Sequence, residues 1–185
     1  MKKPIALYGG SFNPPHVVHA MVCLYLLQTG CRQVWMLPTF RHAFGKALAP
    51  WEDRLEMCRK ATSPLGERVQ VCEVEAENPE VSYTIDTVRK LQARFPEERF
   101  VWVVGSDILG ELDRWKDVEE LLQRIELRVL YRGGYPTGKQ EVSFPALSST
   151  QIRQQLEEGA PVEGWLSQEV IEYIRIKGLY QGGQH

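Results

Sequence analysis

The sequence predicts an α/β fold, an open parallel sheet with helices on both faces. Strand-like and helix-like segments alternate along all 185 residues, and this is the order that parallel strands with crossover helices require. Residues 100–104 form an uninterrupted apolar run, as expected of a central strand that is covered on both faces. The length suits one well-cored domain. We therefore expect residues 1–185 to form a single domain.

Five short runs bounded by turn residues predict the strands. They are residues 5–8, 34–37, 69–74, 100–104 and 127–131. The first run is apolar and ends at two glycines, and the second ends at Pro38, which begins a loop up to Ala49. The third alternates like a strand with one buried face. The fourth leads into Gly105, Ser106 and Asp107.

Capping residues and helical periodicity predict five helices. They are expected from about 15 to 28, from 50 onward, along the stripe 83, 85, 88 and 91, over 148–157, and over 167–177. Prolines open the first two, and Pro96 ends the third. Ser148 with Gln151 forms a capping-box pattern that opens the fourth. Gly178 closes the last.

Composition limits the ligands that the chain can bind. The net charge is -2 and the pI is about 6.1, so there is no global attraction to nucleic acid or to an anionic membrane. Phosphate binding must come from local groups, and the ligand should be small. The four cysteines form no Cys-x-x-Cys pair, and nothing indicates disulfides. The apolar run after Lys3 is too short for a signal peptide, so the expected location is cytoplasmic.

The segment after the first strand has the features of a phosphate site. Gly9-Gly10-Ser11-Phe12-Asn13 reads as a tight turn that leads into Pro14-Pro15-His16. Glycines let backbone N–H groups approach an anion closely, and the start of a helix contributes partial positive charge. His16 and His19 share one face of the first helical turn. A zinc site would need further ligands, and no Cys or acidic residue lies nearby in sequence.

A second phosphate-binding segment lies near the end of the chain. Leu147-Ser148-Ser149-Thr150-Gln151-Ile152-Arg153 combines hydroxyls, backbone donors and a guanidinium at a helix start, all of which suit phosphate oxygens. In open parallel sheets, ligands bind beyond the carboxyl ends of the strands. Residues 9–10, 38, 105–107 and 147–153 should therefore converge on one cleft.

These motifs resemble a known family. Gly-Gly-Ser-Phe-Asn-Pro-Pro-His-x-x-His, at residues 9–19, resembles the signature of the nucleotidyltransferases. Residues 147–153 resemble the Ile-Ser-Ser-Thr-x-Ile-Arg motif of nicotinate and nicotinamide mononucleotide adenylyltransferases, with Leu147 in place of isoleucine. The resemblance covers nearly the whole chain and includes residues 82–87 and 105–107. It implies a Rossmann-like sheet and an enzyme of NAD biosynthesis.

The implied reaction joins ATP to nicotinate or nicotinamide mononucleotide and releases pyrophosphate. The partners are ATP and the pyridine mononucleotide, with Mg²⁺ held through the ATP phosphates and no metal held by protein ligands. Neither nucleic acid nor membrane is an expected partner, and a homo-oligomer is compatible with the sequence. Residues 148–185 are expected to be a helical part that completes the phosphate site.

The resemblance also implies roles for individual residues. The catalytic cations or donors are His16, His19 and Arg153. The ATP-binding residues are Gly9, Gly10, Ser11, Phe12, Gly105, Asp107, Ser148, Ser149 and Thr150. The mononucleotide-binding residues are Asn13, Lys46, Tyr83, Thr84 and Trp115. Among these, Gly105 and Asp107 match residues that bind the adenosine ribose, and Trp115 matches a tryptophan that stacks on the pyridine ring.

Three departures from the family pattern leave the acceptor open. Asn13 stands where bacterial members commonly have aspartate, and Val18 occupies the glycine position of His-x-Gly-His. The loop 38–46 lacks the common Pro-Pro-His-Lys and is closer to a Tyr-x-Lys-Lys loop, with Lys46 in register to hold the acceptor's phosphate. The alternatives are a phosphopantetheine adenylyltransferase or a cytidylyltransferase, and a non-catalytic nucleotide sensor. Residues 82–87 and 148–153 favour the pyridine-nucleotide enzyme, and intact His16, His19 and Arg153 disfavour a sensor.

Overall fold

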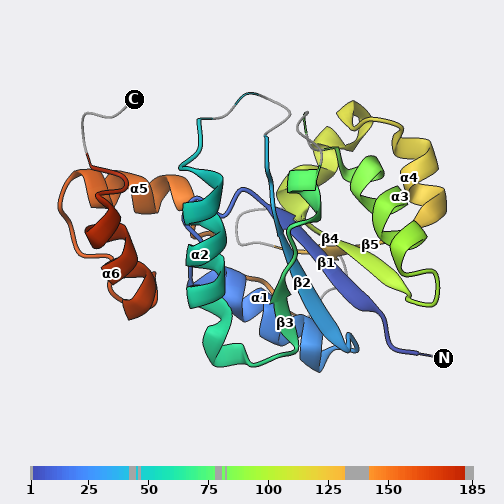
Figure 1. The fold of residues 1–185 in the computed structure, drawn as a ribbon, viewed down its shortest axis with the longest axis horizontal. Coiled ribbons are helices and arrows are strands. Elements are labelled where there is room, and N and C mark those ends of the chain that lie inside the picture. The colour runs from blue at the N-terminus through green and yellow to red at the C-terminus, as the bar shows by residue number, and fades with distance from the viewer. Residues whose placement is uncertain are drawn as a thin grey trace.

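Five parallel strands form one sheet in the computed structural model, which describes residues 2–41, 45, 47–77, 81, 83–131 and 142–181. The strand order is β3-β2-β1-β4-β5 (Figure 1). The strands are β1 (Ile5–Gly10), β2 (Gln33–Pro38), β3 (Val69–Val71), β4 (Phe100–Gly105) and β5 (Glu126–Leu130). This order is that of a Rossmann-like fold. The predicted α/β open parallel sheet is confirmed.

The fold contains α-helices and short 3-10 helices in addition to the strands. The α-helices are α1 (Val17–Gln28), α2 (Trp51–Thr62), α3 (Thr84–Arg94), α4 (Val118–Arg124), α5 (Ser149–Glu157) and α6 (Gln168–Lys177). Short 3-10 helices span Ser63–Leu65 (η1), Val74–Glu77 (η2) and Ser106–Arg114 (η3). No helix of the described residues is both long and apolar enough to cross a membrane.

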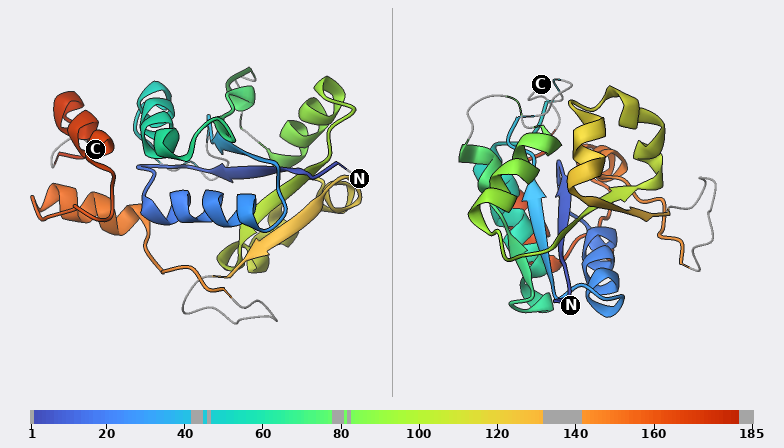
Figure 2. Two further views of the ribbon diagram at one scale, coloured as in Figure 1. Left: turned by 90° about the horizontal axis from the view of Figure 1, so that it is seen from below. Right: turned by 90° about the vertical axis from the view of Figure 1, so that its right-hand side faces the viewer.

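Alternate residues of each strand face opposite sides of the sheet, as the period of two requires. In β1, Ala6 and Tyr8 belong to the apolar cluster that includes α1, and Ile5 and Leu7 belong to the cluster that includes α3 and α4. The left-hand view of Figure 2 shows α1 below the strands and α3 above them. The predicted helices on both faces are therefore confirmed.

The two C-terminal helices pack against α2. A third apolar cluster joins Met57 of α2 to Ile152 of α5 and to Val170 and Ile174 of α6. The hydroxyl of Tyr173 on α6 also donates a hydrogen bond to Asp53 Oδ1 of α2 at 2.8 Å. Since α2 also contacts β2 and β3, these contacts attach the C-terminal helices to the sheet edge nearest α2 (Figure 1).

The first strand is longer than predicted. Gly9 and Gly10 do not begin the turn but continue β1, in register with Leu37 and Pro38 of β2. A Cβ atom on Gly9 would lie 2.9 Å from the Trp102 ring, so the backbone approaches that ring too closely for any side chain. The left-handed residue of the turn is Phe12, with φ of 45°.

Two other predicted elements are wrong in extent. The first helix begins at Val17 rather than at residue 15, because His16 is extended (φ -141°) as its N-cap. The strand predicted at 69–74 ends at Val71, and the buried Val74 packs from η2 instead. The prediction also omitted η3 and α4. The left-handed Asp117 separates them and α4 is only seven residues long, so the segment shows no sustained helical period.

Replacing Gly9 with alanine should destabilise the fold. The added methyl group would meet the ring of Trp102, which is 4% exposed and packed in the sheet, so we expect the free energy of unfolding to fall by about 1–3 kcal/mol. Urea denaturation of Gly9→Ala measures this. Gly110→Ala is the matched control, because no atom lies within 4 Å of a Cβ there. Equal stability of Gly9→Ala and wild type would contradict the argument.

Candidate functional site

A cavity of about 860 Å³ lies beyond the carboxyl ends of β1 and β4. β1 pairs with β2 on one side and with β4 on the other, so the strand order reverses beside it, and ligands bind at such a switch point. Fourteen of the residues predicted for the site line the cavity. They are Gly9, Gly10, Ser11, Phe12, Asn13, His19, Tyr83, Thr84, Gly105, Asp107, Trp115, Ser149, Thr150 and Arg153.

Of the three other predicted residues, two are described and do not line the cavity. Lys46 lies outside the described residues. Ser148 is absent from the cavity wall and serves as the N-cap of α5, where its hydroxyl accepts from the Gln151 backbone N–H at 3.3 Å. The predicted capping box is therefore confirmed. His16 is also absent from the wall, because it is buried beside His19. Its predicted role in phosphate contact stays a prediction.

His19 is held in one orientation by its neighbours. Its ring stacks on His16, with centroids 3.7 Å apart, and meets Phe12 edge-on at 4.9 Å. Its Nδ1 accepts the backbone N–H of His16 at 3.0 Å. A neutral histidine that accepts at Nδ1 carries its proton on Nε2. His19 is 9% exposed and lines the cavity, so its Nε2–H is the candidate donor that this residue brings to the site.

Asn13 connects three parts of the chain. Its Oδ1 accepts from the Tyr180 hydroxyl at 2.6 Å and from the Ala49 backbone N–H at 3.1 Å. Because an amide N–H can only donate, the Ala49 contact fixes which amide atom of Asn13 is the oxygen. Both acceptor positions of Oδ1 are thus occupied, and burial raises the pKa of Tyr180, which keeps that hydroxyl a donor. Only the Asn13 NH₂ group is left for a ligand.

The start of α5 lies against the turn after β1. Ser149 Oγ donates to the carbonyl oxygen of Pro14 at 2.8 Å, and Arg153 Nη1 donates to that of Asn13 at 2.8 Å. Arg153 Nη2 also donates to Thr150 Oγ1 at 3.3 Å. Residues more than 130 positions apart in sequence thus form one wall, with a guanidinium and two hydroxyls on it. Such groups, at a helix start, suit phosphate oxygens.

Aromatic residues line another part of the cavity. Trp115 packs partly against the apolar cluster under α3 and also lines the cavity, so it is both a core aromatic and a wall residue. Tyr83 was expected on the buried stripe of α3. It is instead the N-cap of that helix and is 37% exposed, with Lys116 Nζ 4.8 Å from its ring centroid.

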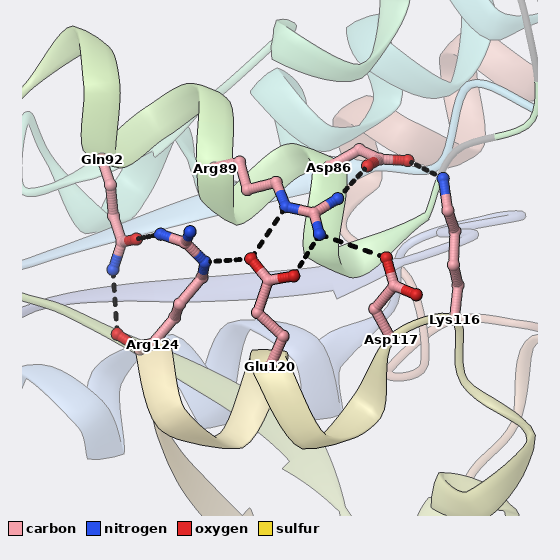
Figure 3. Close-up of polar contacts among 7 residues, drawn as sticks. All are labelled: Asp86, Arg89, Gln92, Lys116, Asp117, Glu120 and Arg124. Carbon is pink, nitrogen blue, oxygen red and sulfur yellow. Dashed lines mark hydrogen bonds and ion pairs between the residues drawn. The ribbon is translucent and has the colours of Figure 1, made fainter.

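A network of charged side chains fixes the segment that carries Trp115 (Figure 3). Arg89 of α3 binds Asp86, Asp117 and Glu120, and Lys116 Nζ lies 2.8 Å from Asp86 Oδ2. The hydrogen bonds from Arg89 and Arg124 lower the pKa of Glu120 to about 2, so Glu120 stays charged even in mild acid. The network ties residues 116–120, which follow Trp115, to α3, the helix that Tyr83 caps.

Comparison with known proteins decides the family. A model of the cytidylyltransferase-like proteins matches residues 7–155. The "Probable nicotinate-nucleotide adenylyltransferase" of Anaeromyxobacter dehalogenans is 46% identical over 184 residues, 97% of this chain and 98% of its own. The chain belongs to the nicotinate-nucleotide adenylyltransferase family.

A second relative agrees with that assignment, and a solved structure agrees with the fold. The protein of the same name from Myxococcus xanthus is 36% identical over 178 residues, which are 95% of this chain and 94% of its own. The structure of Plasmodium falciparum nicotinic acid mononucleotide adenylyltransferase complexed with NaAD superposes with a TM-score of 0.83. It covers 97% of this chain and 98% of its own at 20% identity, and at that identity it supports the fold alone.

Two residues that support the site were not predicted from the sequence. Arg54 donates to the Ser11 carbonyl oxygen at 3.0 Å, and Tyr180 binds Asn13 as described. Arg54 shares the face of α2 that buries Met57 and Cys58, so an arginine on an apolar stripe was an available signal. No signal marked Tyr180, which lies beyond the end of α6.

The donor groups of the cavity are compatible with Mg²⁺ that is held through substrate phosphates. Its carboxylates, on Glu75, Asp107 and Glu111, come from two separate 3-10 helices. Among the described residues, no group of three or more His, Cys, Asp or Glu could hold a metal ion. Mg²⁺ is often bound through substrate phosphates and waters with few protein ligands, which such a wall permits.

Tyr180→Phe should loosen the turn at Asn13. Losing one buried hydrogen bond should lower the free energy of unfolding by about 1 kcal/mol and raise amide exchange at Ala49, whose N–H shares the same acceptor. Urea denaturation and hydrogen exchange measure these effects. Tyr173→Phe removes a hydroxyl that binds Asp53 instead and should leave Ala49 exchange unchanged. Identical Ala49 exchange in both variants would show that Tyr180 does not hold Asn13.

Proposed function

We propose that this protein is an adenylyltransferase of NAD biosynthesis that joins ATP to nicotinate mononucleotide, with nicotinamide mononucleotide as the alternative acceptor. The 5′-phosphate oxygen of the mononucleotide attacks the α-phosphorus of ATP in line. A new P–O bond forms, the bond to the bridging oxygen of pyrophosphate breaks, and pyrophosphate leaves with the electron pair. The observation that carries the proposal is the convergence of His19, the turn 9–13 and Arg153 on one cavity.

The reaction requires the protein to align the substrates and to neutralise negative charge, but it does not require a general base. The attacking phosphate is already an anion, so the barrier depends on alignment and on neutralising charge at the α-phosphate and the leaving group. His19 supplies an oriented Nε2–H, as its Nδ1 contact to the His16 backbone indicates. Arg153 supplies a guanidinium whose Nη1 is anchored on Asn13. His16 keeps its predicted role at the triphosphate.

The residues predicted for the site are assigned to the two substrates as follows. On the ATP side we assign Gly9, Gly10, Ser11 and Phe12 with Ser148, Ser149 and Thr150 to the phosphates. We assign Gly105 and Asp107 to the ribose, because a carboxylate can accept from two hydroxyls. On the acceptor side we assign Asn13, through its free NH₂ group, with Lys46, Tyr83, Thr84 and Trp115. An indole face suits a flat, electron-poor pyridine ring.

Mg²⁺ bound to the ATP phosphates would neutralise part of their charge. We further propose that residues 1–185 act as one domain, in which 148–185 complete the phosphate site, because Ser149 and Arg153 contact the turn after β1. The cytoplasm is the proposed location. Its reducing conditions suit the four free thiols of Cys23, Cys31, Cys58 and Cys72.

The direct test is pyrophosphate release by the purified protein with ATP and Mg²⁺. Nicotinate mononucleotide and nicotinamide mononucleotide are supplied separately under identical conditions. We expect release with at least one acceptor, and a higher kcat/KM with nicotinate mononucleotide. Binding of ATP without release from either acceptor would contradict the proposal and indicate another acceptor or a nucleotide sensor.

His19→Asn separates the structural role of His19 from its catalytic one. Asparagine Oδ1 can replace Nδ1 as acceptor for the His16 N–H, but no donor then occupies the place of Nε2. We expect a folded variant whose kcat is lower by about a hundredfold, equal to roughly 3 kcal/mol. The control is Arg99→Ala, which removes an exposed ion pair to Glu126. Wild-type turnover in His19→Asn would exclude His19 from transition-state stabilisation.

A further inference from the structure

Arg54 is a buried cation that the mechanism above does not use. It is 1% exposed and is absent from the residues that line the cavity. A guanidinium in the interior is costly unless hydrogen bonds replace its water. Burial also lowers its pKa. We therefore expect this buried guanidinium to position the groups to which it donates hydrogen bonds.

The hydrogen bonds of Arg54 end on three separate segments. Nε donates to the carbonyl oxygen of Ala49 at 2.9 Å, just before α2. Nη1 donates to the carbonyl oxygens of Ser11 at 3.0 Å and Thr39 at 2.8 Å. Ser11 follows β1 and Thr39 follows β2, so one side chain joins the ends of two neighbouring strands. All three partners are backbone carbonyls, not carboxylates.

The direction of these carbonyls matters for an anion in the cavity. Ser11 and Thr39 both line the cavity, whereas Arg54 does not. Carbonyl oxygens bound to Arg54 are therefore turned away from the cavity. Carbonyl oxygens facing inward would repel phosphate, so this orientation removes two negative dipole ends from the wall.

The peptide between Thr39 and Phe40 shows where the N–H points when the carbonyl faces Arg54. In a trans peptide, the N–H points opposite to the preceding carbonyl. The Thr39 carbonyl faces Arg54, and the N–H of Phe40 donates to Glu75 Oε2 at 3.3 Å. Glu75 lines the cavity. The peptide between Ser11 and Phe12 is also trans, so the Phe12 N–H must likewise point away from Arg54.

We propose that Arg54 is a positioning residue that turns the Ser11 and Thr39 carbonyls outward and presents the N–H of Phe12, in the turn after β1, to the triphosphate of ATP. The inference rests on the proposed function for the identity of that ligand. Arginine is needed because its fork has donors in separate directions, whereas a lysine has a single nitrogen. Lysine at position 54 keeps the charge and cannot reach all three carbonyls at once.

Arg54→Lys tests this role, with Arg59→Lys as the matched control. Arg59 lies on the same helix but is exposed and paired with Glu56 and Glu73. Two measurements are needed, steady-state kinetics for ATP and hydrogen exchange of the ligand-free protein. We expect Arg54→Lys to lower kcat/KM for ATP at least about tenfold, mainly through KM. We also expect faster exchange at Ser11, Phe12, Asn13 and Phe40, with unchanged exchange in β4, and Arg59→Lys should do neither.

The outcomes decide whether Arg54 has this positioning role. Wild-type kcat/KM and wild-type exchange in Arg54→Lys would overturn the proposal. A uniform rise in exchange over the whole sheet would also overturn it, since Arg54 would then serve stability alone. If wild type itself releases no pyrophosphate but exchange rises only at the two turns, the proposed function fails and the positioning role stands.

Discussion

The site depends on four carbonyl oxygens, at the end of β1 and in the turn that follows it, being bound by other parts of the protein. The oxygen of Gly10 accepts from the Thr39 N–H, and that of Ser11 accepts from Arg54. Those of Asn13 and Pro14 accept from Arg153 and Ser149. Groups that would repel phosphate are thereby satisfied elsewhere, and the N–H groups of the turn become available to an anion. The rest of the fold supplies the donors at the required places.

This constraint explains why distant segments meet at the cavity. α2 provides Arg54 from one side, and α5 provides Ser149 and Arg153 from another. The carbonyl of Trp165, between α5 and α6, accepts the first N–H of α1 from Val17 at 2.8 Å. The C-terminal helices therefore contact both the turn and the helix that follows it. Their packing against α2 through Met57 keeps all these donors in one arrangement.

The sequence predicted the fold class and most of the cavity wall, because those features follow from local patterns. Apolar runs placed all five strands, and the carboxyl-end rule brought Gly105, Asp107 and Arg153 to one place. The sequence alone does not distinguish a glycine that a turn requires from one that close packing requires. Gly9 was therefore assigned to the turn rather than to β1. That distinction depends on Trp102, more than 90 residues away. Arg54 and Tyr180 were not predicted because their partners lie in other segments of the chain: backbone carbonyl oxygens for Arg54, and the side chain of Asn13 for Tyr180.

The hydrogen bonds around Asn13 also bear on the order of folding. The contacts of this turn with Ser149, Arg153 and Tyr180 close chain loops of 135, 140 and 167 residues. Contacts of such long separation form late, after local helices and neighbouring strands. The turn is synthesised before these partners, which follow it by 135 residues or more. A nascent chain can therefore build most of its sheet well before it has a competent phosphate site.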